Sequence, residues 1–202
     1  MRILLTAFEP FGGESTNAAL EAVMRVHAPE GVTLNTLTVP TVFGLGTDTV
    51  LLAMRALRPD AVICVGQAAG RAAITPERVA INVRDARIPD NAGFRPSDEP
   101  IDPRGPAAYF STLPIKAMTE AIQTAGVHAA ISNTAGTFVC NDLFYSVCRA
   151  IEMESLRTVG GFIHVPCTPA QAAAHTPPLA SMPLEDIVRG LEAAIGAVTA
   201  CK

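Results

Sequence analysis

The chain has 202 residues, of which 49% are hydrophobic and 17% are charged, and this composition supports a sizeable buried core rather than a disordered chain. The net charge is -4 and the lysines and arginines are not clustered, so a nucleic-acid-binding surface is not expected. No apolar run approaches the roughly 20 residues that a membrane-spanning helix needs, so no membrane partner is expected.

The N-terminal segment and the cysteines indicate a cellular compartment. Residues 1–8 are largely apolar, but Glu9 and Pro10 interrupt the run, which is too short for a signal peptide and is typical of a first strand. The five cysteines show no spacing typical of a disulfide framework. A cytoplasmic protein with reduced thiols is therefore expected.

Hydrophobic periodicity predicts alternating strands and helices in the first half of the chain. The run at 61–66 is continuously apolar, which is typical of a strand covered on both faces. A weaker alternation at 77–84 predicts a further strand. The other elements predicted here are strands at 2–8 and 33–39 and helices at 17–27 and 41–57.

The second half of the chain opens with residues 85–106, which carry five prolines, four aspartates and one glutamate. This composition predicts a long surface loop, and loops of this length are often functional. The elements predicted after it are a helix at 113–124, a strand at 129–132, a helix from 139, a strand at 158–165, an alanine- and proline-rich connection at 171–181, and a helix at 184–198. Alternating strands and helices predict an α/β fold, a three-layer α/β/α sandwich around a mostly parallel, mixed sheet, as one domain spanning residues 1–202.

Cys140 is the strongest candidate for a nucleophile. Val139, Leu143, Val147 and Ile151 repeat every four residues, so Cys140 is expected in the first turn of a helix. Unpaired backbone N–H groups and the positive end of the helix dipole gather there, and both favour the nucleophilic thiolate. The alternative is a buried, unreactive cysteine, which is common in protein cores.

A nucleophilic cysteine needs a base within hydrogen-bonding reach and usually a third group that orients the base. Of the four histidines, His164 is the strongest candidate because it ends the apolar run 160–163, and ligands meet the carboxyl ends of strands in open α/β sheets. The alternative is a buried histidine that bonds a backbone carbonyl. Chain spacing leaves the orienting group open among Glu77, Asp85, Asn141 and Asp142.

No metal ion or other cofactor is expected from the sequence. His164 and Cys167 have the spacing of half a zinc site, but no second pair of ligands with matching spacing occurs. The glycines at 12–13 and 44–46 do not form a dinucleotide-binding fingerprint, and a phosphate-binding loop motif is absent.

Several motifs spread over nearly the whole chain identify a family resemblance. They are Leu5-Thr-Ala-Phe-Glu-Pro-Phe-Gly-Gly13, Gly66-Gln67, Glu77-Arg-Val-Ala-Ile-Asn82, Asp85-Ala-Arg-Ile-Pro-Asp-Asn91, Ser111-Thr-Leu-Pro114, Ala135-Gly-Thr-Phe-Val-Cys-Asn141 and Gly161-Phe-Ile-His-Val-Pro166. In this order, the motifs resemble those of pyroglutamyl peptidase I, a family of cysteine peptidases.

The resemblance implies an α/β/α fold, a homotetramer as in bacterial members, and removal of N-terminal pyroglutamyl residues from peptides and proteins. It implies a Cys–His–Glu triad, whose members correspond to Cys140, His164 and Glu77, and so selects Glu77 among the open alternatives. The thiolate is expected to attack the pyroglutamyl carbonyl and to form a thioester. Backbone N–H groups beside Cys140 and the side chain of Arg87 are the expected oxyanion donors.

The pyroglutamyl group is a compact neutral lactam, which suits apolar walls with a few placed polar groups. Phe8, Phe11 and Phe138 lie inside the motifs and are interpreted as substrate-binding walls, although core packing is the alternative for each. Asn17 and Gln67 are expected either to bond the lactam or to order the loops around it.

Five positions depart from the family pattern without removing a triad member. They are Ala7, Ala18, Ala69, Asp142 and Cys167, where glycine, proline, glycine, histidine and an aromatic residue are usual. Two rival functions stay open at this point. One is a thiol amidase or esterase that acts on another acyl group, and the other is a non-catalytic member of the family.

Overall fold

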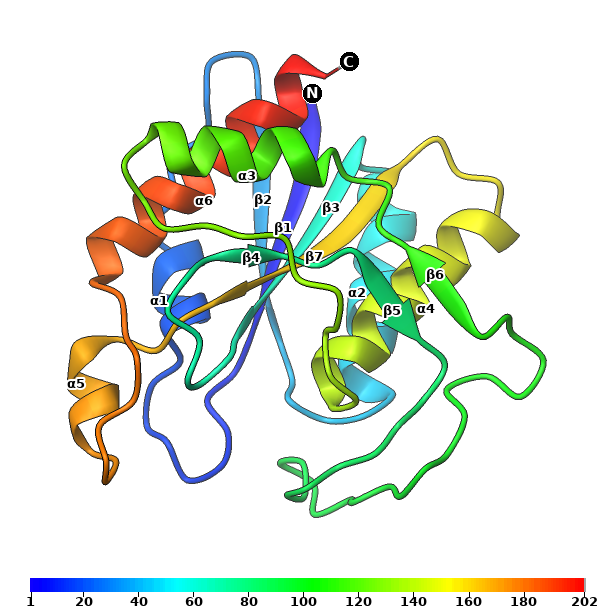
Figure 1. Ribbon diagram of the computed structural model, residues 1–202. Helices are drawn as coiled ribbons and strands as arrows, with labels where there is room; N and C mark the ends of the chain where they lie inside the picture. The colour runs from blue at the N-terminus through cyan, green and yellow to red at the C-terminus, as the bar shows by residue number, and fades with distance from the viewer. Residues whose placement is uncertain (202) are drawn as a thin grey trace.

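The structure is a computed structural model that describes residues 1–201, and its centre is a five-stranded sheet with helices on both faces (Figure 1). The strand order is β2 (Thr33–Val39), β1 (Arg2–Phe8), β3 (Ala61–Gln67), β7 (Val159–Val165) and β4 (Thr75–Pro76). The first four strands run parallel, and β4 pairs antiparallel with β7. The predicted α/β class with a mostly parallel, mixed sheet is confirmed.

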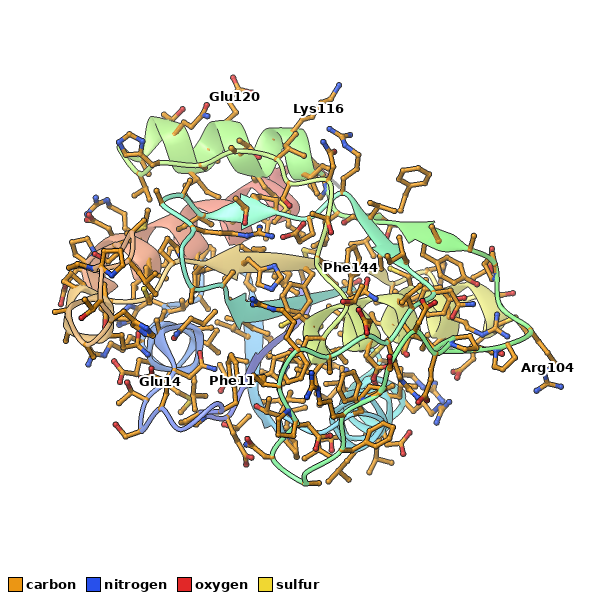
Figure 2. All side chains as sticks on the ribbon, turned by 60° about the horizontal axis from the view of Figure 1, so that its bottom comes forward. Phe11, Glu14, Arg104, Lys116, Glu120 and Phe144 are labelled. Atoms are coloured by element: carbon orange, nitrogen blue, oxygen red, sulfur yellow. The ribbon has the colours of Figure 1, made fainter. Side chains whose placement is uncertain are left out.

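Two apolar cores lie on opposite faces of the sheet, because successive side chains of a strand point to opposite faces. On one face, alternate residues such as Ile3, Leu5 and Ile63 pack with α1 (Ala18–Val23), α3 (Ile115–Thr124) and α6 (Leu184–Ala200). On the other face, Leu4 and Cys64 pack with α2 (Leu45–Leu57) and α4 (Val139–Met153). Figure 2 shows Phe144 of α4 inside the molecule, whereas Lys116 and Glu120 of α3 point outward.

Three short elements escaped prediction. They are β4, β6 (Ala108–Phe110), and α5 (Pro169–Ala173). β6 forms a small antiparallel sheet with β5 (Val79–Ile81), so the strand predicted at 77–84 belongs to this second sheet. Helix α5 lies at the start of the expected connection and has a capping box between Thr168 and Gln171, with Pro169 in its first turn, which is a readable start signal.

The strand predicted at 129–132 is wrong as a regular strand. The segment forms two isolated parallel bridges, Ile74 to Ala129 and Glu77 to Ser132. Its neighbour β4 is two residues long, so a continuous ladder cannot form beside it. The segment still follows the edge of the sheet and leads the chain past Glu77 toward α4.

The loops after the strands gather at one edge of the sheet, the lower edge in Figure 1. The long loop at 85–106 lies next to the loop after β1, because the Asn91 side chain donates to the Pro10 carbonyl at 2.9 Å. The Asn91 backbone N–H also donates to the Thr41 carbonyl at 3.0 Å. Among the residues described, no helix is long and apolar enough to cross a membrane.

Candidate active site

Cys140 lies in the first turn of α4, as predicted. The first intrahelical bond runs from Asp142 N to Phe138 O at 3.1 Å, so the preceding N–H groups, including that of Cys140, lie outside the helix ladder. The residue is half-buried. Cys140 therefore lies at the N-terminal end of α4, among backbone N–H groups that have no partner within the helix.

Gly66 makes room for the Cys140 thiol against the sheet. A Cβ atom added to Gly66 would lie 3.0 Å from Cys140 Sγ and 2.9 Å from the Phe162 ring. Gly66 is the register partner of His164 in the parallel β3–β7 pair, and paired residues face the same side of a sheet. The thiol thus lies on the face from which His164 projects, one strand away.

His164 is bonded to Glu77 in the interior. Nδ1 of His164 lies 2.7 Å from Glu77 Oε1, and the two side chains are 5% and 0% exposed. Glu77 reaches this place because its backbone N–H donates to Phe162 O at 2.8 Å, directly after β4. A carboxylate only accepts hydrogen bonds, so Nδ1 carries the hydrogen in the neutral ring and Nε2 is the basic nitrogen.

Burial shifts the titration of both groups toward their neutral forms. It lowers the pKa of His164 below 6.5, although the hydrogen bond and the negative charge of Glu77 act in the opposite direction. Burial, with repulsion from Glu77 as the second cause, raises the pKa of the Cys140 thiol to about 12. The thiolate expected from the helix position alone is therefore wrong for the unliganded site, because burial outweighs the helix terminus.

The other candidates for the orienting group are engaged elsewhere or exposed. Asn141 bonds the backbone of Ile81 in both directions, at 2.9 and 2.8 Å. Asp142 pairs with Arg84 at 2.6 Å and accepts from Thr47 at 3.1 Å. Asp85 is exposed. Glu77 is the one of the four that the structure places on His164.

An aromatic cluster, defined here as Phe11, Phe43, Phe94 and Phe138, lies beside the start of α4. Phe138 contacts Phe11 and Phe43 with ring centroids 6.0 and 5.3 Å apart, and Phe43 contacts Phe94 at 5.9 Å. Phe43 and Phe94 were missed, since neither carries a local motif signal. Phe8 lies apart from the cluster, 2% exposed in the core, where it stacks on Phe162 at 6.5 Å.

The polar candidates Gln67 and Asn17 differ in which of their side-chain amide groups have hydrogen-bond partners. Gln67 Oε1 accepts from Ala18 N at 2.6 Å and from Gln171 Nε2 at 3.1 Å, whereas its amide nitrogen has no partner among the described residues. Asn17 caps α1 through Oδ1 and donates from Nδ2 to Glu9 O at 3.3 Å. Asn17 therefore orders the loop, and Gln67 retains a free donor.

Arg87 and Gln171 lie in contrasting surroundings. Arg87 is exposed, and its side chain makes no bond within the described part of the chain. Gln171, which the sequence did not indicate, is buried and holds both Gln67 and the Thr16 carbonyl. In the described residues, no cluster of three or more metal-ligating side chains occurs.

Comparisons with known proteins connect this geometry to one family. A sequence profile described as pyroglutamyl peptidase matches residues 1–201. A pyrrolidone-carboxylate peptidase of Levilactobacillus brevis is 53% identical over 201 residues, covering 98% of this chain and 97% of that protein. One of Streptococcus pyogenes serotype M4 is 51% identical, covering 98% of this chain and 92% of its own length.

Solved structures match the fold as well. The crystal structure of Bacillus amyloliquefaciens pyroglutamyl peptidase I has a TM-score of 0.94 and 46% identity, covering 98% of this chain and 97% of that chain. A mutant pyrrolidone carboxyl peptidase from Pyrococcus furiosus has a TM-score of 0.95 and 36% identity, covering 99% of both chains.

Proposed function

Because the chain belongs to the pyroglutamyl peptidase family, which removes N-terminal pyroglutamate, we propose that it cleaves pyroglutamyl peptides with Cys140 as nucleophile, His164 as base and Glu77 as orienting acid. The observation that carries this proposal is the buried 2.7 Å bond between His164 Nδ1 and Glu77 Oε1, on the face of the sheet that holds the Cys140 thiol. A base held by a buried carboxylate beside a thiol matches the general arrangement of nucleophile, base and orienting group.

The first half of the reaction forms a thioester. His164 Nε2 takes the thiol proton while Sγ forms a bond to the pyroglutamyl carbonyl carbon, so the neutral pair becomes charged only as attack proceeds. Glu77 stabilises the imidazolium formed. Backbone N–H groups at the start of α4 hold the oxyanion, and Arg87 is the second donor. The C–N bond then breaks, and His164 gives its proton to the leaving amine.

The second half of the reaction hydrolyses the thioester. His164, again neutral, takes a proton from water, whose oxygen attacks the acyl carbon. The C–S bond breaks, the sulfur regains a proton from His164, and free pyroglutamate leaves. Each proton therefore passes through Nε2, while Nδ1 stays bonded to Glu77.

Recognition of the lactam is assigned to the aromatic cluster and Gln67. The half-buried rings of Phe11 and Phe138 suit the apolar edge of the ring, and the free amide nitrogen of Gln67 suits the lactam carbonyl. Because Gln171 and Ala18 occupy Oε1, Gln67 is held with its donor available. A site built in this way rejects a ring without the carbonyl, since a buried donor would stay unpaired.

The thioester is tested by rapid acid quenching during turnover of a pyroglutamyl ester, followed by intact mass measurement. The expected result is a transient mass increase of one pyroglutamyl group, mapped to the peptide that contains Cys140. Turnover without any such adduct in the wild type, under conditions in which acylation is faster than hydrolysis, would contradict the covalent mechanism.

We also propose a single catalytic domain that works in the cytoplasm as a homotetramer. The family profile spans residues 1–201, which supports one catalytic unit. Leu52, Met153 and Phe110 are 70%, 66% and 69% exposed, and exposed apolar side chains are available for subunit contacts. Light scattering coupled to size-exclusion chromatography tests the assembly, and a monomer at working concentration would contradict it.

A further inference from the structure

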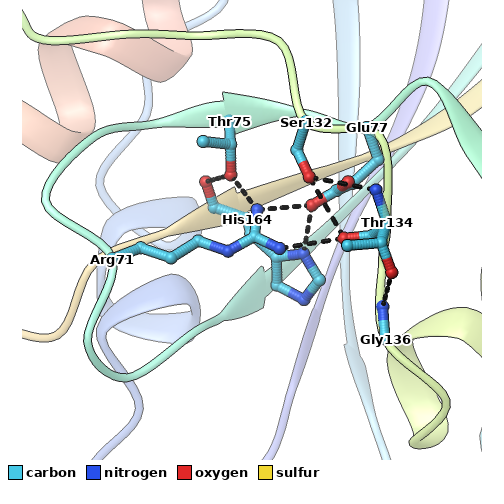
Figure 3. Close-up of polar contacts among 7 residues, drawn as sticks. All are labelled: Arg71, Thr75, Glu77, Ser132, Thr134, Gly136 and His164. Atoms are coloured by element: carbon cyan, nitrogen blue, oxygen red, sulfur yellow. Dashed lines mark hydrogen bonds and ion pairs between the residues drawn. The ribbon is translucent and has the colours of Figure 1, made fainter.

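Arg71 shares the carboxylate oxygen that orients His164 (Figure 3). Its Nη1 donates to Glu77 Oε1 at 2.6 Å, and the same oxygen accepts from His164 Nδ1 at 2.7 Å. The Glu77 side chain is 0% exposed and that of Arg71 is 25% exposed. Within the described structure, the second oxygen, Oε2, is buried and has no hydrogen-bond partner. Arg71 and His164 are thus the two polar side chains that hold this acid.

The second terminal nitrogen of Arg71 contacts the segment that precedes Cys140. Nη2 of Arg71 donates to the Thr134 carbonyl at 3.0 Å, and Nη1 also donates to Thr75 Oγ1. Thr134 lies between the bridge at Ser132 and the start of α4, and its hydroxyl accepts from Gly136 N at 3.1 Å. One planar guanidinium therefore joins Glu77 to the segment 133–138, directly before Cys140.

A buried carboxylate needs such a partner. Taking an ionised group out of water is costly unless it is paired and bonded, and a guanidinium offers several donors in a rigid fork. Arg71 supplies a permanent positive charge 2.6 Å from Glu77 Oε1, so the buried carboxylate has a charged partner even while His164 is neutral and able to act as a base.

We propose that Arg71 is a positioning residue for the reaction: it holds the Glu77 carboxylate aligned on His164, and it fixes the segment before Cys140 relative to that pair. This inference rests on the proposed function. Burial is the largest cause of both shifts, lowering the pKa of His164 and raising that of the Cys140 thiol, and the positive charge of Arg71 acts to lower both pKa values. The titratable groups involved are Glu77, His164, Cys140 and Cys64.

The test compares Arg71→Met and Arg71→Lys with Arg78→Met. Arg78 is a matched control, because its Nε donates at 2.7 Å to Asn133 in the same segment, and its side chain makes no described bond to Glu77. For Arg71→Met, kcat on a pyroglutamyl arylamide is expected to fall roughly 100-fold, as for a misplaced catalytic group, with KM within about two-fold. Arg71→Lys keeps the positive charge but not the two terminal nitrogens of the guanidinium, so its kcat is expected to lie between those of wild type and Arg71→Met.

A second measurement, which needs no substrate, tests the electrostatic effect of Arg71 on His164. In an NMR titration of labelled histidine, His164 is expected to titrate at higher pH in Arg71→Met, since a nearby positive charge is lost. It is expected to be unchanged in Arg78→Met. In a Glu77→Gln background, the Arg71→Lys effect on kcat should be smaller, because only the role of Arg71 at the Thr134 carbonyl is then left to lose.

Three results would overturn the proposal: a kcat for Arg71→Met within two-fold of wild type, an equal loss in Arg78→Met, or an unmoved His164 titration. If Arg71→Met does not fold, as judged by circular dichroism, Arg71→Gln, which also removes the positive charge, is subject to the same criteria. Wild-type enzyme that releases no pyroglutamate would refute the proposed function alone, since the His164 titration still decides the role of Arg71.

Discussion

Gly66 and His164 face each other across the β3–β7 ladder, and the Cys140 thiol occupies the space that a side chain on Gly66 would need. The absent Cβ thus lets the Cys140 thiol approach the sheet at the register position of His164. Successive side chains of a strand point to opposite faces, so the next residue of β3, Gln67, carries its free amide donor on the other face, where its oxygen accepts from Ala18 N.

Gly66→Ala is expected to lower kcat by about ten-fold or more, because even a modest shift of a catalytic group is costly. The added Cβ would meet Cys140 Sγ at 3.0 Å and the Phe162 ring at 2.9 Å. Overpacking is also expected to cost about 1–3 kcal/mol of unfolding free energy. Steady-state kinetics and chemical denaturation measure the two effects separately.

Gly160→Ala is the matched control for that change. Its added Cβ would meet Ile151 Cδ1 at 2.7 Å and Val147 Cγ1 at 3.1 Å on the same face of the sheet, at the other end of β7. It should lose stability and retain kcat. If both variants lost kcat to the same degree, the close approach at Gly66 would have no special role.

The pH dependence of kcat/KM is expected to show an acid limb with its midpoint below pH 6.5. Burial lowers the pKa of His164 from 6.5, and the base works only when neutral, so activity is retained at mildly acidic pH and is lost as the pH falls through that lowered pKa. Because the pKa of the thiol is about 12, no thiolate-forming limb is expected near neutrality. A midpoint above 6.5, with circular dichroism unchanged over the same range, would argue against a buried neutral base.

Gln171→Leu is expected to raise KM for pyroglutamyl substrates by about two- to ten-fold, the effect of one net hydrogen bond of about 0.5–1.5 kcal/mol. The variant removes the 3.1 Å bond to Gln67 Oε1, so the amide of Gln67 is held by the Ala18 N–H alone. Because Gln171 is assigned to recognition, kcat should stay within about two-fold. Gln123→Leu, which loses a bond to the Ala129 carbonyl instead, should leave KM unchanged, and a fall in kcat for Gln171→Leu would reassign that residue to the chemical step.

Phe138→Leu and Phe8→Leu are expected to separate recognition from packing. Phe138 is half-buried in the aromatic cluster, so its loss should raise KM and change stability little. Phe8 is 2% exposed against Phe162, so its loss should cost about 1–3 kcal/mol of unfolding free energy with little effect on KM. The reverse pattern in kinetics and thermal unfolding would place Phe8, not Phe138, at the substrate.

The helix start at Cys140 could be predicted because Val139 and Leu143 begin a four-residue stripe along the chain. The partnership of Glu77 with His164 could not be predicted from spacing. It depends on the two-residue strand β4 pairing antiparallel with β7, and such a short pairing leaves no periodicity to read. The titration of Cys140 was predicted in the wrong direction, since burial by the surrounding fold is not visible in a local helix pattern.

Residues whose role depends on distant contacts escaped prediction for the same reason. Phe43 reaches Phe138 only through the packing of α2 beside α4. Arg71 meets Thr134 across 63 positions of the chain. The departure at position 142 is accommodated by a similar contact, since Asp142 pairs with Arg84, and the departure at position 18 leaves an N–H that donates to Gln67.

Attack of Cys140 on a pyroglutamyl carbonyl is tested by comparing hydrolysis of pyroglutamyl, prolyl and glutaminyl arylamides by wild type, Cys140→Ser and Cys148→Ser. Cys148 is a buried cysteine on the same helix and serves as the control. We predict turnover of the pyroglutamyl substrate alone, a loss of at least about 1000-fold in Cys140→Ser, and near wild-type activity in Cys148→Ser. Equal turnover of the three substrates would contradict specificity for the pyroglutamyl group, and activity that survives in folded Cys140→Ser would show that Cys140 is not the nucleophile.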